Sequence, residues 1–219
     1  ADADRVAAAL TAALDGLPRA GELEEPDHSV QVNATQDQPR LVTESLDVTQ
    51  GKLALGFRTG GACVWEEDYS ALLVFNALYG GTPTSKLFLN VREKLSLCYF
   101  ASSMLEKFKG VMVVSSGIEF GNYEKAKAEI LAQLDNCRTG AFEDWELEGA
   151  RRAVISALRA TMDAQGRLED YWMGQAVAGL EEPPQDLVDR VEAVTREQVV
   201  AVAKKMELDT IYFLKGKED

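Results

Sequence analysis

The feature that most constrains the fold of this chain is the order in which strand-like and helix-like patterns follow one another. Residues 41–49 and 52–59 alternate apolar and polar side chains, as half-buried strands do. Residues 97–105 and 110–118 form a second strand-like pair, joined by a short charged segment. Two hairpin-like pairs with helices between them predict an α+β fold, with a mostly antiparallel sheet and helices packed on one face.

Apolar residues at helical spacing occupy most of the remaining chain. Glu66, Glu67 and Asp68 crowd the first turn of the helix after the first strand pair, where they suit the positive end of its dipole. Paired glycines at 80–81 predict a left-handed end for that helix, and Thr195 is expected to cap a late one. The expected helices span residues 4–15, 65–79, 85–94, 123–136, 144–163, 167–180, 185–194 and 196–206, and a last strand spans 210–214.

The length of 219 residues suits a single domain that spans residues 1–219. With 46% hydrophobic and 27% charged residues, the chain can build a sizeable core, so disorder is not indicated. The sequence has no initiator methionine and opens directly into a helical pattern. We therefore expect it to be one part of a longer, two-domain polypeptide.

Charge and cysteine usage narrow the range of partners and compartments. A net charge of −13 repels phosphate backbones and anionic lipid heads, so neither nucleic acid nor a membrane is expected as a partner. No apolar run approaches the ~18 residues that cross a bilayer, and no signal peptide is visible. Three widely spaced cysteines, Cys63, Cys98 and Cys137, form neither a disulfide pattern nor a zinc-binding pattern. These features suit a reducing cytoplasm.

Residues able to carry catalysis are few. The one histidine of the sequence, His28, lies in a polar segment, whereas zinc sites take several histidine or cysteine ligands and the H-x-x-E-H motif is absent. No G-x-S-x-G elbow and no nucleotide-binding glycine loop occurs either. A carboxylate site for magnesium or calcium stays open, without a D-x-D-x-D-G loop to support it. We predict no catalytic residue, no metal site and no cofactor in this chain.

Residues 80–99 form the most informative stretch, in which paired glycines precede a short helix and then a strand. Arg92, near the end of that helix, offers a permanently charged fork, and Tyr99, seven residues on, offers a neutral donor. If the turn between them folds back, both tips converge on one point, where they can hold a peptide carbonyl or an oxyanion. The alternative is a surface arginine paired with Glu93 or Glu119 and a packed strand tyrosine.

The pattern GG-x3-SKLF-x-NVREK-x-SL-x-Y over residues 80–99 resembles the second domain of the pitrilysin/insulinase-type (inverzincin) metallopeptidases. That group includes pitrilysin, insulin-degrading enzyme, mitochondrial processing peptidase and small bacterial relatives. The blocks QGKLALGFRT at 50–59 and VSSGIEFGNYEKAKAEILAQL at 114–134 fit the same domain in the same order. The resemblance runs from about residue 4 to residue 215, and the chain is most similar to the paired peptidase-like proteins of Gram-positive bacteria.

The resemblance implies a clamshell of two similar domains around a chamber. One domain carries H-x-x-E-H and a distal glutamate for zinc, while the other contributes an arginine and a tyrosine that bind the substrate backbone. Arg92 and Tyr99 match those two positions. Two departures stand out: Ser96 replaces a frequent glycine, and the helix at 65–79 reads D-Y-S-A-L-L, without zinc ligands. The resemblance therefore implies a zinc-free domain whose zinc belongs to a partner domain.

Three functions fit these observations. The leading hypothesis is a non-catalytic, substrate-binding half of a zinc metallopeptidase, which grips a peptide beside a homologous zinc-bearing domain or sister subunit. The second is a structural or assembly domain that has lost proteolysis, and it predicts no H-x-x-E-H in the sister half either. The third is a peptide-binding module with an open sheet edge. The partner could be fused, encoded separately, or a second copy in a homodimer, and whether the complete protein is an enzyme stays open.

Overall fold

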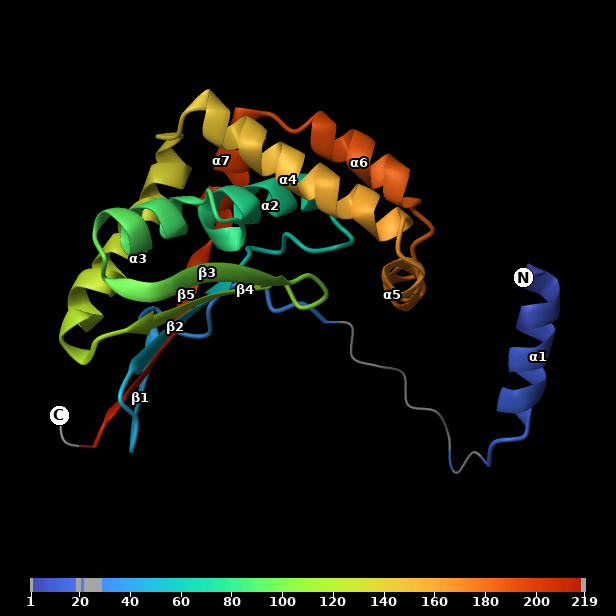
Figure 1. The fold of residues 1–219 in the computed structure, drawn as a ribbon, viewed down its shortest axis with the longest axis horizontal. Coiled ribbons are helices and arrows are strands. Elements are labelled where there is room, and N and C mark those ends of the chain that lie inside the picture. Colours follow the sequence, from blue (N-terminus) through green and yellow to red (C-terminus); the bar gives the residue numbers. More distant parts are fainter. Residues whose placement is uncertain (1, 19–20, 22–28, 218–219) are drawn as a thin grey trace.

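A computed structural model describes residues 2–18, 21 and 29–217. Its centre is a five-stranded sheet with the strand order β1-β5-β2-β4-β3 (Figure 1). Strands β1 and β3 lie at the two edges, and the final strand of the chain, β5, lies in the interior between β1 and β2. The strands are β1 (Arg40–Leu46), β2 (Gly51–Arg58), β3 (Cys98–Glu106), β4 (Val111–Ile118) and β5 (Glu207–Gly216).

Strand pairing confirms a mostly antiparallel sheet. The β2–β5, β2–β4 and β3–β4 pairs are antiparallel, and β1–β5 is parallel. The second strand-like pair of the sequence is a true hairpin, but the prediction of a first hairpin was wrong, because β5 lies between β1 and β2. Alternation of side chains shows that a segment is a strand, whereas it does not show which strand lies beside it.

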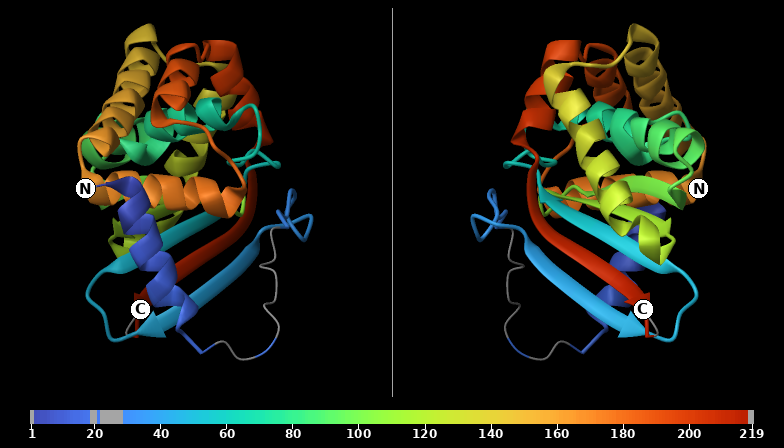
Figure 2. Two further views of the ribbon diagram at one scale, coloured as in Figure 1. Left: turned by 90° about the vertical axis from the view of Figure 1, so that its right-hand side faces the viewer. Right: turned by 90° about the vertical axis from the view of Figure 1, so that its left-hand side faces the viewer.

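The helices cover one face of this sheet, as predicted, and no helix of the described residues packs on the other face (Figures 1 and 2). The short segment η3 (Phe120–Asn122) leads from β4 into the first long helix. The helices on this face are α2 (Tyr69–Asn76), η1 (Ala77–Gly81), η2 (Leu87–Lys94), α3 (Tyr123–Thr139), α4 (Asp144–Met162), α5 (Gln165–Ala178), α6 (Pro184–Glu192) and α7 (Arg196–Lys205).

The core lies between the sheet and the helix layer. On β2, the buried side chains Leu53, Leu55 and Phe57 alternate with more exposed ones, so this strand presents one apolar face to the helices. Met112 and Val114 on the neighbouring β4 are fully buried on the same side. The helices therefore pack against the apolar face of the central strands β2 and β4.

Two glycine pairs differ in what they do. Gly60 and Gly61 end β2 with positive φ values of 62° and 87°, so they break the strand as predicted. Gly80 and Gly81 have no positive φ, so the predicted left-handed helix end is wrong. They lie inside the π-helix η1, where a Cβ on Gly80 would come within 2.6 Å of the Ser103 hydroxyl. Gly80 therefore allows η1 to approach β3 closely, and neither glycine reverses the chain.

Helix ends show where local sequence decides. Thr195 caps α7 in a capping box with Gln198, as the sequence pattern predicts. Gly140 ends α3 in the left-handed conformation. By contrast, α2 begins at Tyr69, so Glu66 and Glu67 precede the helix instead of filling its first turn. Asp68 instead forms an ion pair with Lys205 of α7.

The N-terminal helix α1 (Ala3–Asp15) lies apart from the other elements, and none of its residues is buried (Figures 1 and 2). Its exposed apolar side chains include Val6, Leu10 and Leu14. Within the described part of the chain, no helix is long and apolar enough to cross a membrane.

Candidate functional site

Arg92 and Tyr99 flank the turn that connects η2 to β3, and η2 packs against β3. Backbone hydrogen bonds close this turn: Ser96 N–H donates to Arg92 C=O at 3.0 Å, and Leu97 N–H donates to Val91 C=O at 3.0 Å. The helix thus folds back directly into the strand. The two predicted residues are held on adjacent, well-defined elements, which is the arrangement that the sequence spacing predicts.

Ser96 is the tightest point of the turn. Its φ of 49° lies in the left-handed region, and no other non-glycine residue of the described chain has a positive φ. A side chain there costs about 1 kcal/mol, which glycine avoids. The departure from glycine at this position is therefore a local strain that the surrounding hydrogen bonds hold in place.

The Arg92 side chain is 38% exposed and only loosely tied. Its guanidinium lies over the Phe88 ring at 4.6 Å from the centroid, and its Nε is 3.6 Å from a carboxylate oxygen of Glu93. The Glu93 contact is the one that the alternative interpretation of a surface arginine predicts. However, an ion pair at this distance and exposure contributes little, so the guanidinium remains available to a ligand.

Tyr99 is 76% exposed, so the alternative of a packed strand tyrosine is wrong. A register irregularity between Cys98 and Phe100 interrupts the β3–β4 ladder at this residue. Such a bulge redirects side chains away from the regular alternation. Among the described residues, no hydrogen bond or ring contact joins Tyr99 to Arg92, so their convergence on one ligand stays a prediction.

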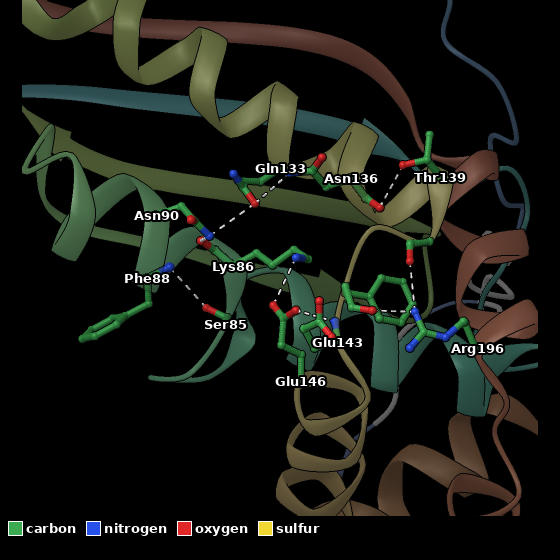
Figure 3. A network of polar contacts seen from close by, with 12 residues as sticks. Ser85, Lys86, Phe88, Asn90, Gln133, Asn136, Thr139, Glu143, Glu146 and Arg196 are labelled. Carbon is green, nitrogen blue, oxygen red and sulfur yellow. Dashed lines mark hydrogen bonds and ion pairs between the residues drawn. The ribbon is translucent and has the colours of Figure 1, made fainter.

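An ion pair between Lys86 and Glu146 joins the start of η2 to α4 (Figure 3). Lys86, just before η2, is 5% exposed, and its Nζ lies 3.0 Å from Glu146 Oε1 in the first turn of α4. The other oxygen of Glu146 accepts the Glu143 N–H at 2.7 Å and closes the capping box of α4. One carboxylate therefore joins the start of η2 to the start of α4.

A chain of amides extends this support to α3 (Figure 3). Asn90 Nδ2 donates to Lys86 C=O at 2.9 Å and to Gln133 Oε1 at 3.3 Å. Asn136 also donates to Gln133 Oε1, and Gln133 itself donates to Glu129 at 2.7 Å. Because Gln133 is buried, these bonds fix the position of η2 relative to α3.

Two thiols report on the electrostatics around η2. Burial raises the pKa of Cys98, while a hydrogen bond with Ser116 and the nearby charge of Arg92 oppose that rise. Burial raises the pKa of Cys137 to about 12, and the Lys86 charge opposes it. Both thiols therefore stay protonated at neutral pH and are weak nucleophiles.

Comparison with known proteins decides the family. A sequence profile described as the peptidase M16 inactive domain matches residues 1–154. The chain belongs to this family. The resemblance to pitrilysin/insulinase-type peptidases is thereby confirmed, and the chain is an M16 inactive domain.

Relatives of this M16 domain are about twice its length. It is 41% identical over 181 residues to the probable inactive metalloprotease YmfF of Bacillus subtilis, covering 83% of this chain and 42% of the relative. A conserved protein of Enterococcus faecalis superimposes with a TM-score of 0.84 at 31% identity, over 97% of this chain and 50% of that one. A protease of Helicobacter pylori shares the fold, with a TM-score of 0.82 at 19% identity, and covers 98% of this chain and 53% of its own.

The described residues of the M16 domain do not form a site that fits zinc. Within residues 2–18, 21 and 29–217, no group of three or more His, Cys, Asp or Glu side chains could hold a metal ion. The helix expected to correspond to a zinc helix, α2, buries Tyr69, Ser70, Ala71 and Leu72 in the core instead. His28, the one histidine, lies outside the described residues.

Sequence reasoning missed the residues that support the site. Lys86 and Glu146 stand 60 positions apart, and nothing local to either one indicates the partner. The one available signal is that Lys86 directly precedes the apolar residue Leu87 of a short amphipathic helix, where an unpaired lysine would be costly. The π-helical form of η2 was also not predicted, although such segments recur at functional sites.

Proposed function

We propose that this M16 domain grips the backbone of an extended peptide at the η2–β3 junction, beside a zinc-bearing partner domain. The observation that carries the proposal is the contrast between a firmly held junction and two accessible tips. Arg92 has one weak ion pair, and Tyr99 is 76% exposed. An aromatic ring exposed to this degree at the start of an edge strand is available for a ligand to cover.

The chemistry of the two tips suits a peptide backbone. A guanidinium presents several N–H donors in a fixed fork, and a phenol adds one O–H donor, so both match carbonyl oxygens. The adjacent strand β3 lies at an edge of the sheet, where backbone groups can pair with an added strand. An extended peptide could therefore meet Arg92, Tyr99 and the β3 edge together.

The partner in this proposal is a second, similar domain. Since the domain spans about half the length of its relatives, the other half supplies the opposite wall of the chamber. Zinc would belong to that half, because the described residues of this domain form no group that could hold a metal ion. The role of this domain is to bind and orient the peptide.

The test uses the full-length protein together with its partner domain. Arg92→Ala and Tyr99→Ala should each lower kcat/KM for a peptide substrate about 100-fold, because each removes donors that act on developing negative charge. Binding of a fluorescent peptide, measured by anisotropy, should weaken about 10-fold and needs no catalysis as a readout. Full activity and full binding in both variants would overturn the proposal.

Two matched variants separate this role from a general surface effect. Lys94→Ala removes a neighbouring exposed cation from η2, and Met104→Ala removes a side chain of β3 that is 71% exposed. Neither should change peptide affinity by more than about two-fold, because Lys94 carries a point charge without a fork and Met104 lies five residues beyond Tyr99 on β3. Equal losses in Lys94→Ala and Arg92→Ala would show that charge alone, rather than the fork, attracts the peptide.

A second candidate, an assembly domain without peptide binding, is favoured by one finding. The 41% identical relative in Bacillus subtilis carries the name of an inactive metalloprotease. This alternative expects no peptide binding by the full-length protein and no H-x-x-E-H motif in the partner half. The anisotropy measurement and the partner sequence therefore distinguish the two functions.

A further inference from the structure

A pocket of about 340 Å³ is lined by residues of α2, η1, α4, α5 and α6 and by Lys107 of the β3–β4 turn. Small residues contribute to its lining, with Ala77 from η1 and Ala153 and Ala157 from α4. Leu73, Leu158 and Leu187 line it with apolar surface. Its volume falls in the range of small-molecule sites, which are mostly apolar with a few placed polar groups.

Lys107 brings a positive charge into this pocket from the β3–β4 turn. Partial burial lowers the pKa of its ammonium, and the Glu106 charge opposes that effect. The ammonium lies 5.0 Å from the centroid of the Phe108 ring, and no carboxylate of the described residues forms an ion pair with it. Gly174 of α5 leaves room for it, since a Cβ there would lie 3.3 Å from Lys107 Nζ.

Tyr69 supplies a second donor from the α2 side of the pocket. It is 6% exposed, and its hydroxyl makes no hydrogen bond to any residue that the structure describes. Burial raises its pKa, with Tyr171 and Glu182 adding to the effect and Arg190 opposing it, so the group is a neutral donor. By contrast, the hydroxyl of Tyr171 donates to Glu182 C=O at 3.0 Å.

Several other polar groups near the pocket are already engaged. Glu182 pairs with Arg190 at 2.9 Å, and the Thr161 hydroxyl donates to Ala157 C=O at 3.1 Å. The Lys107 ammonium and the Tyr69 phenol are among the pocket donors that have no hydrogen bond to a described residue. Such a set lacks an acceptor, and a buried donor without a partner is costly.

We infer that this pocket binds a carboxylate carried on an apolar stem, with Lys107 and Tyr69 as donors to the carboxylate and the leucine walls around the stem. Two sources share this chemistry: a medium-chain fatty acid and the C-terminal residue of an apolar peptide. The site lies on the helix layer and uses neither Arg92 nor Tyr99, so it stands or falls separately from the peptide grip at η2–β3.

The experiment is calorimetry on the full-length protein with octanoate, N-acetyl-leucyl-leucine and the uncharged octanamide. Octanoate or the dipeptide should bind, and octanamide should bind at least about 10-fold more weakly, because it lacks the charge that Lys107 pairs with. Which of the two carboxylates binds more tightly identifies the source. Absence of binding by both at millimolar concentration, or equal binding of octanamide, would overturn the inference.

Variants locate the binding in this pocket. Lys107→Met should weaken binding about 10-fold, and Tyr69→Phe about 3-fold, because each removes one donor. Ala157→Leu, at an exposed position, should block the pocket without disturbing the core. Lys109→Met, in the same turn, is the matched control and should leave the affinity unchanged. An equal loss in Lys109→Met and Lys107→Met, or unchanged affinity in Ala157→Leu, would place the ligand elsewhere.

Discussion

Two basic residues of one short segment, Lys86 and Arg92, behave in opposite ways. Lys86 is 5% exposed and lies 3.0 Å from its carboxylate, whereas Arg92 is 38% exposed and lies 3.6 Å from its own. Their local sequence contexts do not separate them. What differs is the neighbour that the fold provides: the start of α4 for Lys86, and only residues of η2 itself, Phe88 and Glu93, for Arg92.

This contrast divides the segment into a base and two tips. The base, Lys86 with Glu146, fixes η2 in space, because a buried pair is sensitive to the loss of either partner. The tips, Arg92 and Tyr99, contribute little to stability and remain free to meet a ligand. Variants of the base should therefore change folding, while variants of the tips should change binding alone.

The largest effect is expected from breaking the Lys86–Glu146 ion pair at the base of the segment. Lys86→Ala leaves the Glu146 carboxylate, whose side chain is 11% exposed, without its partner and should lower the free energy of unfolding by about 3 kcal/mol. Urea denaturation followed by circular dichroism measures this loss. Arg152→Ala is the control, because the exposed pair of Arg152 with Glu148 is worth less than about 1 kcal/mol.

A double variant sharpens the same point. Lys86→Met with Glu146→Leu removes both charges and fills the space, so it should recover most of the stability that the single variant loses. Recovery would show that the base acts through the pairing of buried charges. A double variant as unstable as Lys86→Ala would contradict that account.

The next effect concerns the close packing that holds η1 beside β3. Gly80→Ala should cost about 1–3 kcal/mol, because its Cβ would lie 2.7 Å from the backbone nitrogen of Ser103. Gly149→Ala, in the interior of α4, meets nothing within 4 Å and should stabilise the domain by about 0.5–1 kcal/mol. Melting temperatures that move in the same direction for both variants would contradict this reading of Gly80.

The glycine pairs also show how far the sequence alone could go. Both pairs follow regular elements and look alike as letters, yet Gly60–Gly61 needs positive φ and Gly80–Gly81 needs space. The element types, the helix layer and the hairpin of β3 with β4 follow from local periodicity. The insertion of β5 between β1 and β2 does not, because it depends on contacts about 150 residues apart in the chain.

The candidate site divides in the same way. The motif around residues 80–99 led to Arg92 and Tyr99, and the structure places both at one turn with accessible side chains. Lys86, Glu146 and the pocket around Lys107 were not predicted, since each arises where segments distant in sequence meet. Local sequence patterns therefore predicted Arg92 and Tyr99, whereas the Lys86–Glu146 pair could be found only in the folded structure.

A smaller effect is expected at the turn between base and tips. Ser96→Gly should raise the free energy of unfolding by up to about 1 kcal/mol, because glycine adopts a φ of 49° without strain. Ser102→Gly, an exposed position of regular β3, should instead lower it by about 0.5–1 kcal/mol. Chemical denaturation of the two variants compares them directly, and a loss of stability in Ser96→Gly would show that the serine side chain itself supports the turn.

The smallest change in stability is expected at the tips. Arg92→Lys keeps the charge but loses the fork, and Tyr99→Phe loses one exposed hydroxyl, so each should change the free energy of unfolding by less than about 0.5 kcal/mol. The same two variants should still weaken peptide binding in the full-length protein, because a bidentate donor and a phenol O–H are lost. A stability loss of several kcal/mol in either variant would place that residue in the base, and unchanged peptide binding would leave the tips without the role proposed for them.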